Sequence, residues 1–371
     1  NTDILNLYEL GRGRKKQEIG ILFVELGLKL LKPKGILFAI VPNGYLGNTK
    51  SDYVAMRRMI IDKYTLLGII KLPDNAFARS GTGVATSILI IQNKKPKKKY
   101  SIFIEDVKTI GYTLNKKNTP FKYKMTSDGY YQCDKDSNPI LDEELTNAKK
   151  LFQRFVFKKK ISNLLFTNTP HKPAYQSFKK SDMDLNLIFD IKRYLDIYKN
   201  TIDACKKSNY KTLRDYCNTN TTFKFKKTAS QYYYIDIKSV NTPLYNPNLY
   251  PNVLLPSRGK YKVEKNDILI SKLKGKISFT VVTESKDNLI ASNGFSVIRP
   301  KDEKSLVIIF ANLFTEEFKI QHQSMVTGSI METLSDDDIK NIYIKEDIDY
   351  EKYNTILSSI AILNCELTTL G

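Results

Sequence analysis

Apolar residues recur at two different spacings along the first hundred residues of the chain. From Ile19 to Leu31 they follow three- and four-residue steps, which predicts an amphipathic helix ended by Pro33 and Gly35. Three short apolar runs bounded by turn residues come after it, and such runs are typical of strands buried on both faces of a sheet. The runs cover 36–41, 66–72 and 86–92, and a polar helix over 48–63 follows the first. This order predicts an α/β fold built on a doubly wound sheet.

The next hundred residues carry weaker signals. A run over 100–104 predicts one more strand, a candidate for the edge of the sheet. The polar stretch 115–138 predicts irregular structure. A helix is expected over 140–157, with three acidic residues in its first turn: Asp142, Glu143 and Glu144. The composition of 158–184 predicts a linker, so we expect one domain at 1–157 and a second at 185–371.

The second region alternates short apolar runs with turns of Asn, Gly, Pro and Lys, which predicts a mixed, mostly antiparallel sheet in an α+β domain. A helix is expected over 305–325, and a short helical turn begins near Ser335. A last strand at 342–344 precedes a terminal helix over 347–370, which could pack on the domain or pair with another helix.

Charge narrows the possible partners. The 371 residues hold 59 basic and 39 acidic side chains, a formal net charge of +20. An AT-rich genome accounts for much of the lysine, but an excess of this size also favours a polyanion, and nucleic acid is more usual than an anionic membrane surface. No run of 18 apolar residues and no signal peptide is present, so we expect a cytoplasmic protein without a membrane span.

The chain offers little for metal or histidine chemistry. Its four cysteines form no C-x-x-C pair, which argues against a zinc knuckle and favours free thiols. The two histidines, His171 and His322, lie far apart in the sequence.

Three segments in the first third of the chain, taken in order, are similar to one family. They read FVELGLKLLKPKGILFAIVPNGYLGN, GIIKLPDNAFARSGTGVATSILIIQNK and IFIEDVKTIGYT. This set resembles the second half of the catalytic domain of adenine-N6 DNA methyltransferases, the modification subunits of type I restriction systems and their fused relatives. The resemblance implies part of a doubly wound, Rossmann-like methyltransferase sheet.

The second region resembles the target-recognition domain of type I specificity subunits. The matching segments are YYYIDIKSVN, KNDILISKLKGK, IASNGFSVIRP and TGSIMETLSDDDIKNIYI, followed by the terminal helix. One chain with both parts resembles fused methylase–specificity enzymes of restriction-modification systems. Its implied partners are double-stranded DNA and other subunits of such a system, or a second copy through the terminal helix, with no membrane partner.

Two motifs of the methyltransferase family are absent. The family binds S-adenosylmethionine with a Gly-rich loop after its first strand and positions the target amine with an Asn/Asp-Pro-Pro-Tyr/Phe turn. The nearest pattern, Gly11-Arg12-Gly13, has no strand before it. We therefore expect a C-terminal piece of a longer enzyme, inactive alone, with its cofactor motifs upstream. The alternative is a non-catalytic DNA-binding specificity module with a degenerate methylase-like docking domain.

The resemblance also assigns one residue near the chemistry. Phe77 occupies the position at which the family stacks an aromatic ring on the flipped adenine, although a core position at the end of a strand is an equal alternative. Asn43 and Tyr45 follow a predicted strand, where α/β sheets place ligands, but turn formation is the stronger interpretation for both.

Candidate DNA contacts are basic residues in turns or on a predicted strand, and a solvated surface is the alternative for each. Lys272, Lys274 and Lys276 alternate, so a strand over 267–276 would point all three to one side together with Ser271. The other candidates are Arg258 and Lys260 in a turn, Lys224 and Lys226, and Arg12 and Arg14 in the first polar loop.

Overall fold

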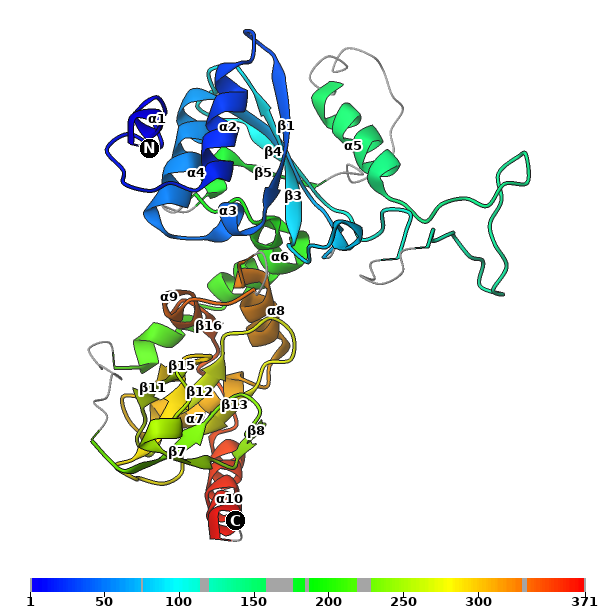
Figure 1. The fold of residues 1–371 in the computed structure, drawn as a ribbon. Coiled ribbons are helices and arrows are strands. Elements are labelled where there is room, and N and C mark those ends of the chain that lie inside the picture. The colour runs from blue at the N-terminus through cyan, green and yellow to red at the C-terminus, as the bar shows by residue number, and fades with distance from the viewer. Residues whose placement is uncertain are drawn as a thin grey trace. The chain divides into compact units, whose positions relative to one another are not determined.

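The computed structural model describes residues 2–74, 76–113, 120–157, 176–183, 187–218, 228–328 and 332–369. The chain divides into two compact units, one of residues 1–195 and 327–330 and one of residues 196–326 and 331–371 (Figure 1). The first division lies later than the predicted linker because Phe189, Ile191 and Tyr194 are buried in the core of the first unit. Part of the predicted linker is also a strand, β5 (Gln176–Lys179).

The first unit is built on a five-stranded mixed sheet in the order β1–β3–β2–β4–β5. The strands besides β5 are β1 (Ile36–Pro42), β2 (Thr65–Lys71), β3 (Thr86–Gln92) and β4 (Ser101–Asp106). Each run that predicted a strand forms one. Only β2 and β4 pair in parallel, whereas β1, β2 and β5 pair antiparallel with their other neighbours. Strand β4 is interior rather than at the edge, because β5 pairs with its outer side.

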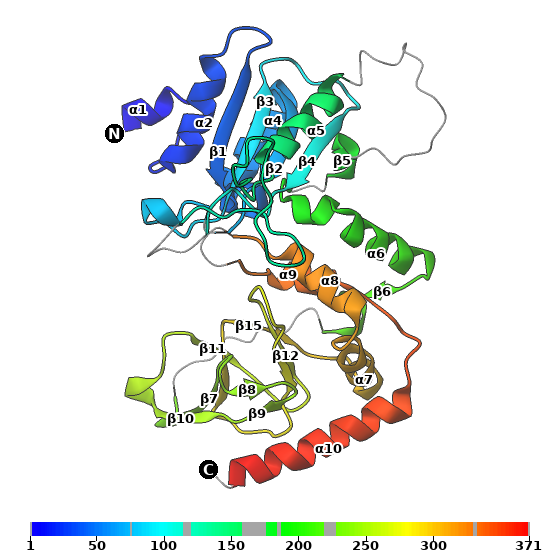
Figure 2. The ribbon, with the colours of Figure 1, turned by 90° about the vertical axis from the view of Figure 1, so that its right-hand side faces the viewer.

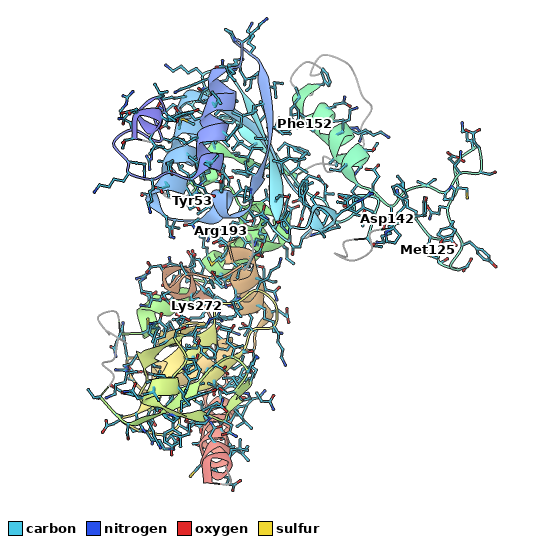
Figure 3. The ribbon with its side chains drawn as sticks, viewed as in Figure 1. Tyr53, Met125, Asp142, Phe152, Arg193 and Lys272 are labelled. Carbon is cyan, nitrogen blue, oxygen red and sulfur yellow. The ribbon has the colours of Figure 1, made fainter. Side chains whose placement is uncertain are left out.

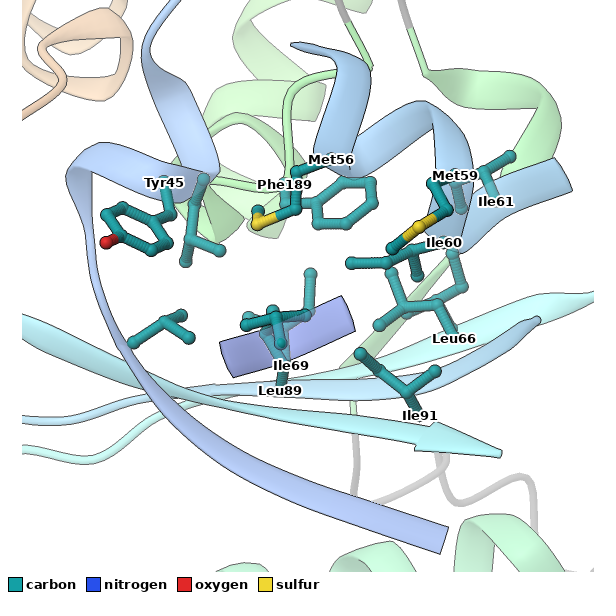
Figure 4. Packing of buried hydrophobic residues seen from close by; sticks show 14 of the residues in the cluster. Tyr45, Met56, Met59, Ile60, Ile61, Leu66, Ile69, Leu89, Ile91 and Phe189 are labelled. Atoms are coloured by element: carbon teal, nitrogen blue, oxygen red, sulfur yellow. The ribbon is translucent and has the colours of Figure 1, made fainter. Parts of the chain in front are cut away.

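Helices cover both faces of this sheet (Figure 2). Helices α2 (Ile19–Lys29) and α4 (Ser51–Lys63) pack on one face and form the main core, drawn in Figure 4, with residues such as Ile60, Ile69 and Leu89. Helix α5 (Leu145–Phe157) packs on the other face and carries Phe152, which is labelled in Figure 3. The Phe152 ring meets the Phe103 ring edge-on, with centroids 5.4 Å apart. The short elements are α1 (Thr2–Asn6), α3 (Gly44–Gly47), and the 3₁₀ turns η1 (Ala78–Ser80), η2 (Lys180–Asp182) and η3 (Ile191–Tyr194).

The buried side of α2 differs from the predicted one. Ile21, Val24 and Leu28 are buried, whereas Ile19 and Phe23, which belong to the predicted apolar stripe, are 68% and 66% exposed. The prediction was wrong because this helix carries apolar residues on most of its sides, so that spacing alone does not select the side that packs.

Strand β1 is also not buried on both faces, contrary to the prediction. Leu37, Ala39 and Val41 face the main core, but Ile36, Phe38 and Ile40 on the opposite face are 43%, 61% and 55% exposed. The core under α5 is made of residues from β2, β3 and β4 together with α5 and Val107, so this face of β1 is left uncovered.

Irregular structure was expected over 115–138, and the described part, 120–138, contains isolated bridges and no named helix or strand. Two such bridges pair Tyr123 with Leu141 and Ile110 with Glu143. They delay the start of α5 to Leu145, so the acidic residues 142–144 precede the helix instead of occupying its first turn. Glu143 still caps the helix, because its carboxylate accepts a hydrogen bond of 2.9 Å from the backbone N–H of Thr146.

The second unit contains small sheets, mostly antiparallel as predicted. A four-stranded sheet has the order β10–β7–β14–β11 and a three-stranded sheet the order β13–β12–β15, and β7 with β14 is a parallel pair. The strands are β7 (Gln231–Ile235), β10 (Asn248–Pro251), β11 (Gly259–Lys262), β12 (Ile268–Ser271), β13 (Phe279–Val281), β14 (Leu289–Ser292) and β15 (Phe295–Ile298). Two-stranded sheets pair β6 (Lys211–Thr212) with β16 (Tyr343–Ile344) and β8 (Val240–Asn241) with β9 (Leu244–Tyr245).

The predicted helix over 305–325 is two helices, α7 (Glu303–Asn312) and α8 (Glu316–Met325). The break occurs because the Thr315 hydroxyl accepts a hydrogen bond from the backbone N–H of Phe318 and starts a new helix. The other helical elements of this unit are α6 (Asp196–Lys207), α9 (Asp336–Lys340), α10 (Tyr350–Thr369), η4 (Leu213–Tyr216) and η5 (Asn252–Leu254).

The two elements predicted near the C-terminus are present. Ser335 caps α9, since its hydroxyl accepts a 3.0 Å hydrogen bond from the backbone N–H of Asp338. Helix α10 packs on the domain through Ile360 and other apolar residues near its start, while Ile362 and Leu363 are 61% and 46% exposed. The structure therefore supports packing on the domain, and pairing with another helix stays a prediction. In the described part of the chain, no helix combines the length and apolar character needed to cross a bilayer.

Candidate functional site

The carboxyl end of β1 meets the start of β3, and a buried hydrogen bond joins them. The side-chain carbonyl of Asn43 accepts a 2.7 Å bond from the Ser87 hydroxyl, and the Asn43 backbone N–H donates to the Ala85 carbonyl at 2.9 Å. Asn43 is 3% exposed. Its polar groups therefore hold the turn after β1, in agreement with the interpretation of Asn43 as a turn residue.

Tyr45 is likewise held by the protein itself. Its hydroxyl donates to one carboxylate oxygen of Glu18 at 2.6 Å, and the Tyr53 hydroxyl donates to the other at 2.6 Å. Burial and the Glu18 carboxylate raise the pKa of Tyr45, and the same two causes raise the pKa of Tyr53 to about 12. Arg57, fully buried, donates to the Tyr45 carbonyl at 2.7 Å. This network fixes α3 against α2 and α4.

Phe77 lies in the loop after β2, where the sequence resemblance places a stacking aromatic. The ring is half-buried, between the buried residues Ala76 and Ala78. The Tyr112 hydroxyl donates to the Ala76 carbonyl at 2.7 Å, and Gly81 with φ +81° closes the turn. The loop is thus anchored on both sides of Phe77, while a role of the ring in base stacking stays a prediction.

A charged cluster that sequence reasoning missed occupies the carboxyl ends of the parallel strands β2 and β4. Lys71 is 9% exposed, and its Nζ lies 3.8 Å from Oδ1 of Asp106, whose Oδ2 is 2.5 Å from Lys108 Nζ. Burial and the charges of Glu144 and Asp106 raise the pKa of Glu105. Ligands of α/β proteins bind at this end of parallel strands. The available signal was a lysine within the apolar run 66–72 and an acidic pair directly after the run 100–104.

Arg12 and Arg14 lie in the loop between α1 and α2. Arg12 is exposed, whereas Arg14 forms an ion pair with Asp52 at the start of α4. Arg14 is therefore partly neutralised, and phosphate contact by either residue stays a prediction.

The predicted strand over 267–276 ends at Ser271, so the alternation argument for the lysine row was wrong. Ser271 is 1% exposed, and the three lysines follow in a bend rather than on one side of a strand. The strand ends there because Lys272 and Leu273 leave the sheet: the Lys272 carbonyl accepts from the Leu334 N–H, and Leu273 forms a bridge with Thr333.

Two of these lysines have carboxylate partners. Nζ of Lys272, labelled in Figure 3, lies 2.9 Å from Asp336 Oδ1 and 5.5 Å from the centre of the Tyr261 ring. Nζ of Lys274 lies 3.0 Å from the Glu332 carboxylate. Lys276 is exposed. Any anion that binds Lys272 or Lys274 must therefore compete with an acidic side chain.

Arg258 and Lys260 are both exposed, on either side of the buried Gly259 at the start of β11. A Cβ at Gly259 would lie 3.0 Å from Ile290 Cδ1, so the close approach of the turn to β14 favours glycine. The turn holds the two cations in solvent. Lys224 and Lys226, the remaining candidates, lie outside the described residues.

In the described part of the first unit, neither the glycine pattern nor a small cavity fits a binding site for S-adenosylmethionine. Gly11 and Gly13 follow helix α1 rather than a strand, and both serve the turn: a Cβ at Gly11 would lie 2.4 Å from the Leu5 carbonyl oxygen, and Gly13 has φ +73°. A cavity of about 180 Å³ beside Thr65 and Gln92 lies at the opposite end of the sheet from the Phe77 loop. Small-molecule sites are usually larger, roughly 300–1,000 Å³.

Residues 7–138 match the family described as N-6 DNA methylase. This stretch of the chain belongs to that family. The methylase region, as we call residues 7–138, includes strands β1 to β4, the Phe77 loop and the Lys71–Asp106 cluster. Members of the family use S-adenosylmethionine as the methyl donor. No curated protein matches the chain.

Several solved structures are similar to the chain. They include the HsdS subunit from Thermoanaerobacter tengcongensis (20% identity over 42% of this chain and 41% of that one, TM-score 0.33), the type IIG restriction endonuclease BpuSI (12%, 94% and 44%, TM-score 0.37) and the M protein of the type I restriction enzyme EcoKI (21%, 36% and 24%, TM-score 0.25). The chain spans less than half of each. At TM-scores below 0.5, none of the three defines the fold or function of this chain.

Proposed function

We propose that the chain takes part in site-specific methylation of adenine N6 in DNA as part of a restriction-modification system, with the DNA sequence read by the second unit. The observation that carries the proposal is the family match over residues 7–138. That match covers strands β1 to β4, and the carboxyl ends of β2 and β4 bear an anchored aromatic loop and a partly buried lysine–carboxylate cluster.

Methyl transfer to adenine N6 depends more on the position of the adenine amine than on acid–base catalysis. The exocyclic amine of adenine is a poor nucleophile because its lone pair is delocalised into the ring. The base must leave the duplex, stack on an apolar or aromatic surface, and have its amine aimed at the methyl group. In this proposal Phe77 supplies the stacking surface. Its support is the anchoring of the loop through Tyr112 and Gly81.

In the second unit the proposed DNA contacts are the exposed cations. Arg258, Lys260 and Lys276 project into solvent, and arginine can pair with two acceptors of guanine. Lys272 and Lys274 would reach phosphates only by exchanging Asp336 and Glu332 for them. Subunits of the same restriction system, or a second copy that uses the exposed residues of α10, are the proposed protein partners.

DNA recognition is tested by selection from a pool of 30-bp duplexes with random centres. The 371-residue chain should enrich one recurring sequence. Replacing Arg258, Lys260 and Lys276 together by Gln should weaken binding and lower the slope of log K against log salt by up to about 3, since each phosphate contact contributes about 0.9. A matched control replaces three exposed lysines of the first unit, Lys95, Lys97 and Lys98. Enrichment of no sequence, or an equal effect of the control, contradicts the proposed reading surface.

Methylation is tested with labelled S-adenosylmethionine and the enriched duplex. The 371-residue chain alone should transfer no methyl group, because it contains neither the Gly-rich loop nor the Asn/Asp-Pro-Pro turn. A gene product that also supplies both motifs should form N6-methyladenine, and Phe77→Ala in it should reduce transfer. Label on cytosine contradicts the proposed function. Label on adenine incorporated by the chain alone contradicts the expectation that the chain is inactive without the two motifs.

A second candidate is a DNA-binding specificity module whose methylase region serves only for docking. Its support is that Gly11 and Gly13 serve a turn after helix α1 instead of a cofactor loop. The two candidates are separated by calorimetry with S-adenosylmethionine on the natural gene product: binding supports the methyltransferase, and its absence supports the module.

A further inference from the structure

The connection between β10 and β11 is firmly held to the four-stranded sheet. Leu255, at its centre, is 8% exposed and packs with Tyr232, Tyr234 and Ile290. Backbone bonds hold it at both ends: the Asn252 N–H donates to the Ser230 carbonyl at 2.8 Å, and the Arg258 carbonyl accepts from Asn293 at 2.8 Å. The conformation of this connection is therefore set by the protein core.

The same connection turns two adjacent apolar side chains outward. Val253 is 91% exposed and Leu254 is 68% exposed, both within the 3₁₀ turn η5, while the next residue, Leu255, is buried. Leu249 on the edge strand β10 is a further exposed apolar residue, at 48%. A single exposed apolar side chain is ordinary, but a rigid loop that presents two neighbours to water is typical of an interaction site.

All charged residues near this apolar pair in the sequence, over residues 246–263, are basic. Residues 246–263 contain Arg258, Lys260 and Lys262 and no aspartate or glutamate. Lys262 is 3.6 Å from Asp287, while Arg258 and Lys260 are exposed in the turn that follows Leu255. Exposed cations a few residues along the chain from an apolar tip match a partner that has anionic groups on its outside and an apolar interior that the tip can reach. Duplex DNA is such a partner, with phosphates on its rim and stacked bases in its grooves.

We propose that Val253 and Leu254 form an apolar wedge that enters a groove of duplex DNA and opens one base-pair step, while Arg258 and Lys260 hold the adjacent phosphates. The inference rests on the proposed function, because it assumes that the second unit binds DNA. It adds a pair of residues that would recognise the shape and deformability of the DNA rather than its base edges. Flexible pyrimidine–purine steps should therefore be favoured.

The test uses the full chain and the 30-bp duplex that it enriches from the random pool, with 2-aminopurine placed in turn at each adenine. The wild-type chain should raise 2-aminopurine fluorescence at one step. Val253→Ser combined with Leu254→Ser should abolish that rise and weaken binding about tenfold without a change in salt slope, because no charge is removed. Arg258→Gln combined with Lys260→Gln should instead lower the slope by about 2.

Ile197→Ser is the matched control, since Ile197 of α6 in the same unit is 59% exposed. It should leave both affinity and fluorescence unchanged, and circular dichroism melts should show that every variant is folded. If the Val253/Leu254 variant binds and perturbs the duplex as wild type does, the wedge is refuted while the proposed function stands. If the wild-type chain enriches no duplex, both fail. Binding to 3:1 phosphatidylcholine–phosphatidylserine vesicles in place of duplex DNA, lost in the same variant, would overturn the assignment of the partner.

Discussion

Nε2 of His322 lies 2.8 Å from the carbonyl oxygen of Ser271, inside the core of the second unit. The ring is fully buried, and its other nitrogen, Nδ1, has no hydrogen-bond partner among the described residues. The contact is satisfied by a neutral ring that donates from Nε2. Because Ser271 ends β12 and precedes Lys272, this histidine supports the bend that carries the candidate lysines.

The buried histidine predicts a loss of stability in acid. Burial lowers the pKa of His322 below its ordinary value of 6.5, and the Ser271 carbonyl only partly offsets this. Below pH 6.5 the unfolded chain binds a proton that the folded chain does not, so the free energy of unfolding falls as pH drops through that value, by up to about 1.4 kcal/mol per pH unit. Urea unfolding at pH 7.5 and pH 5.0 should show the fall, and His322→Gln should reduce it. An equal pH dependence in both proteins would contradict this role.

The buried Asp267 forms a bidentate ion pair with the partly exposed Arg299, with Nε–Oδ1 and Nη2–Oδ2 distances of 2.7 and 2.8 Å. Burial raises the pKa of the fully buried Asp267 despite this partner. Arg299→Ala would strand the carboxylate and should destabilise the second unit by about 3–5 kcal/mol. Glu264→Gln, which removes only the exposed third member of the cluster, should cost less than about 1 kcal/mol. Denaturant unfolding measures both, and equal costs would show that the pair is not the main support.

The bond between Asn43 and Ser87 should stabilise the first unit. Ser87→Ala leaves the buried side-chain carbonyl of Asn43 without its donor and should cost about 1–3 kcal/mol. Ser101→Ala, at an exposed position on β4, should change stability by less than about 0.5 kcal/mol. In a double-mutant cycle, Ser87→Ala should cost less in an Asn43→Ala background. Additive effects would mean that the two side chains do not interact.

Asp336 should weaken the interaction of Lys272 with DNA. Because Asp336→Asn removes the charge that neutralises Lys272, it should strengthen binding to random-sequence duplex DNA and steepen the salt slope by up to about 1. Asp337→Asn is the control, as Asp337 is exposed beside Arg214 rather than Lys272. Asp336→Asn and Asp337→Asn change the net charge of the chain by the same amount. A specific role of Asp336 therefore requires that its substitution has the larger effect on DNA binding. Fluorescence anisotropy at several salt concentrations measures both variants.

The sequence by itself determined several of the segments that become strands and the start of one short helix. The apolar runs near Ile36, Leu66 and Thr86 form strands, and each run is bounded by turn residues that end the strand. The cap at Ser335 was predictable because its hydroxyl bonds to a backbone N–H only three residues away. The turn role of Asn43 followed from its place after a strand, whereas Tyr45 lies in the short helix α3. All of these features depend on neighbours close in the chain.

Only the tertiary structure decided strand direction, burial and charge pairing. Phe38 is exposed because α5 covers other strands, and β4 is interior because β5 joins it from some 70 residues away in the sequence. Lys272 is neutralised by a residue 64 positions later. The spacing of residues along a chain predicts which side of a helix or strand is apolar or charged. It does not show which residue of a distant segment will pack against that side. Whether a side chain of this protein is free to meet DNA is therefore a property of the fold.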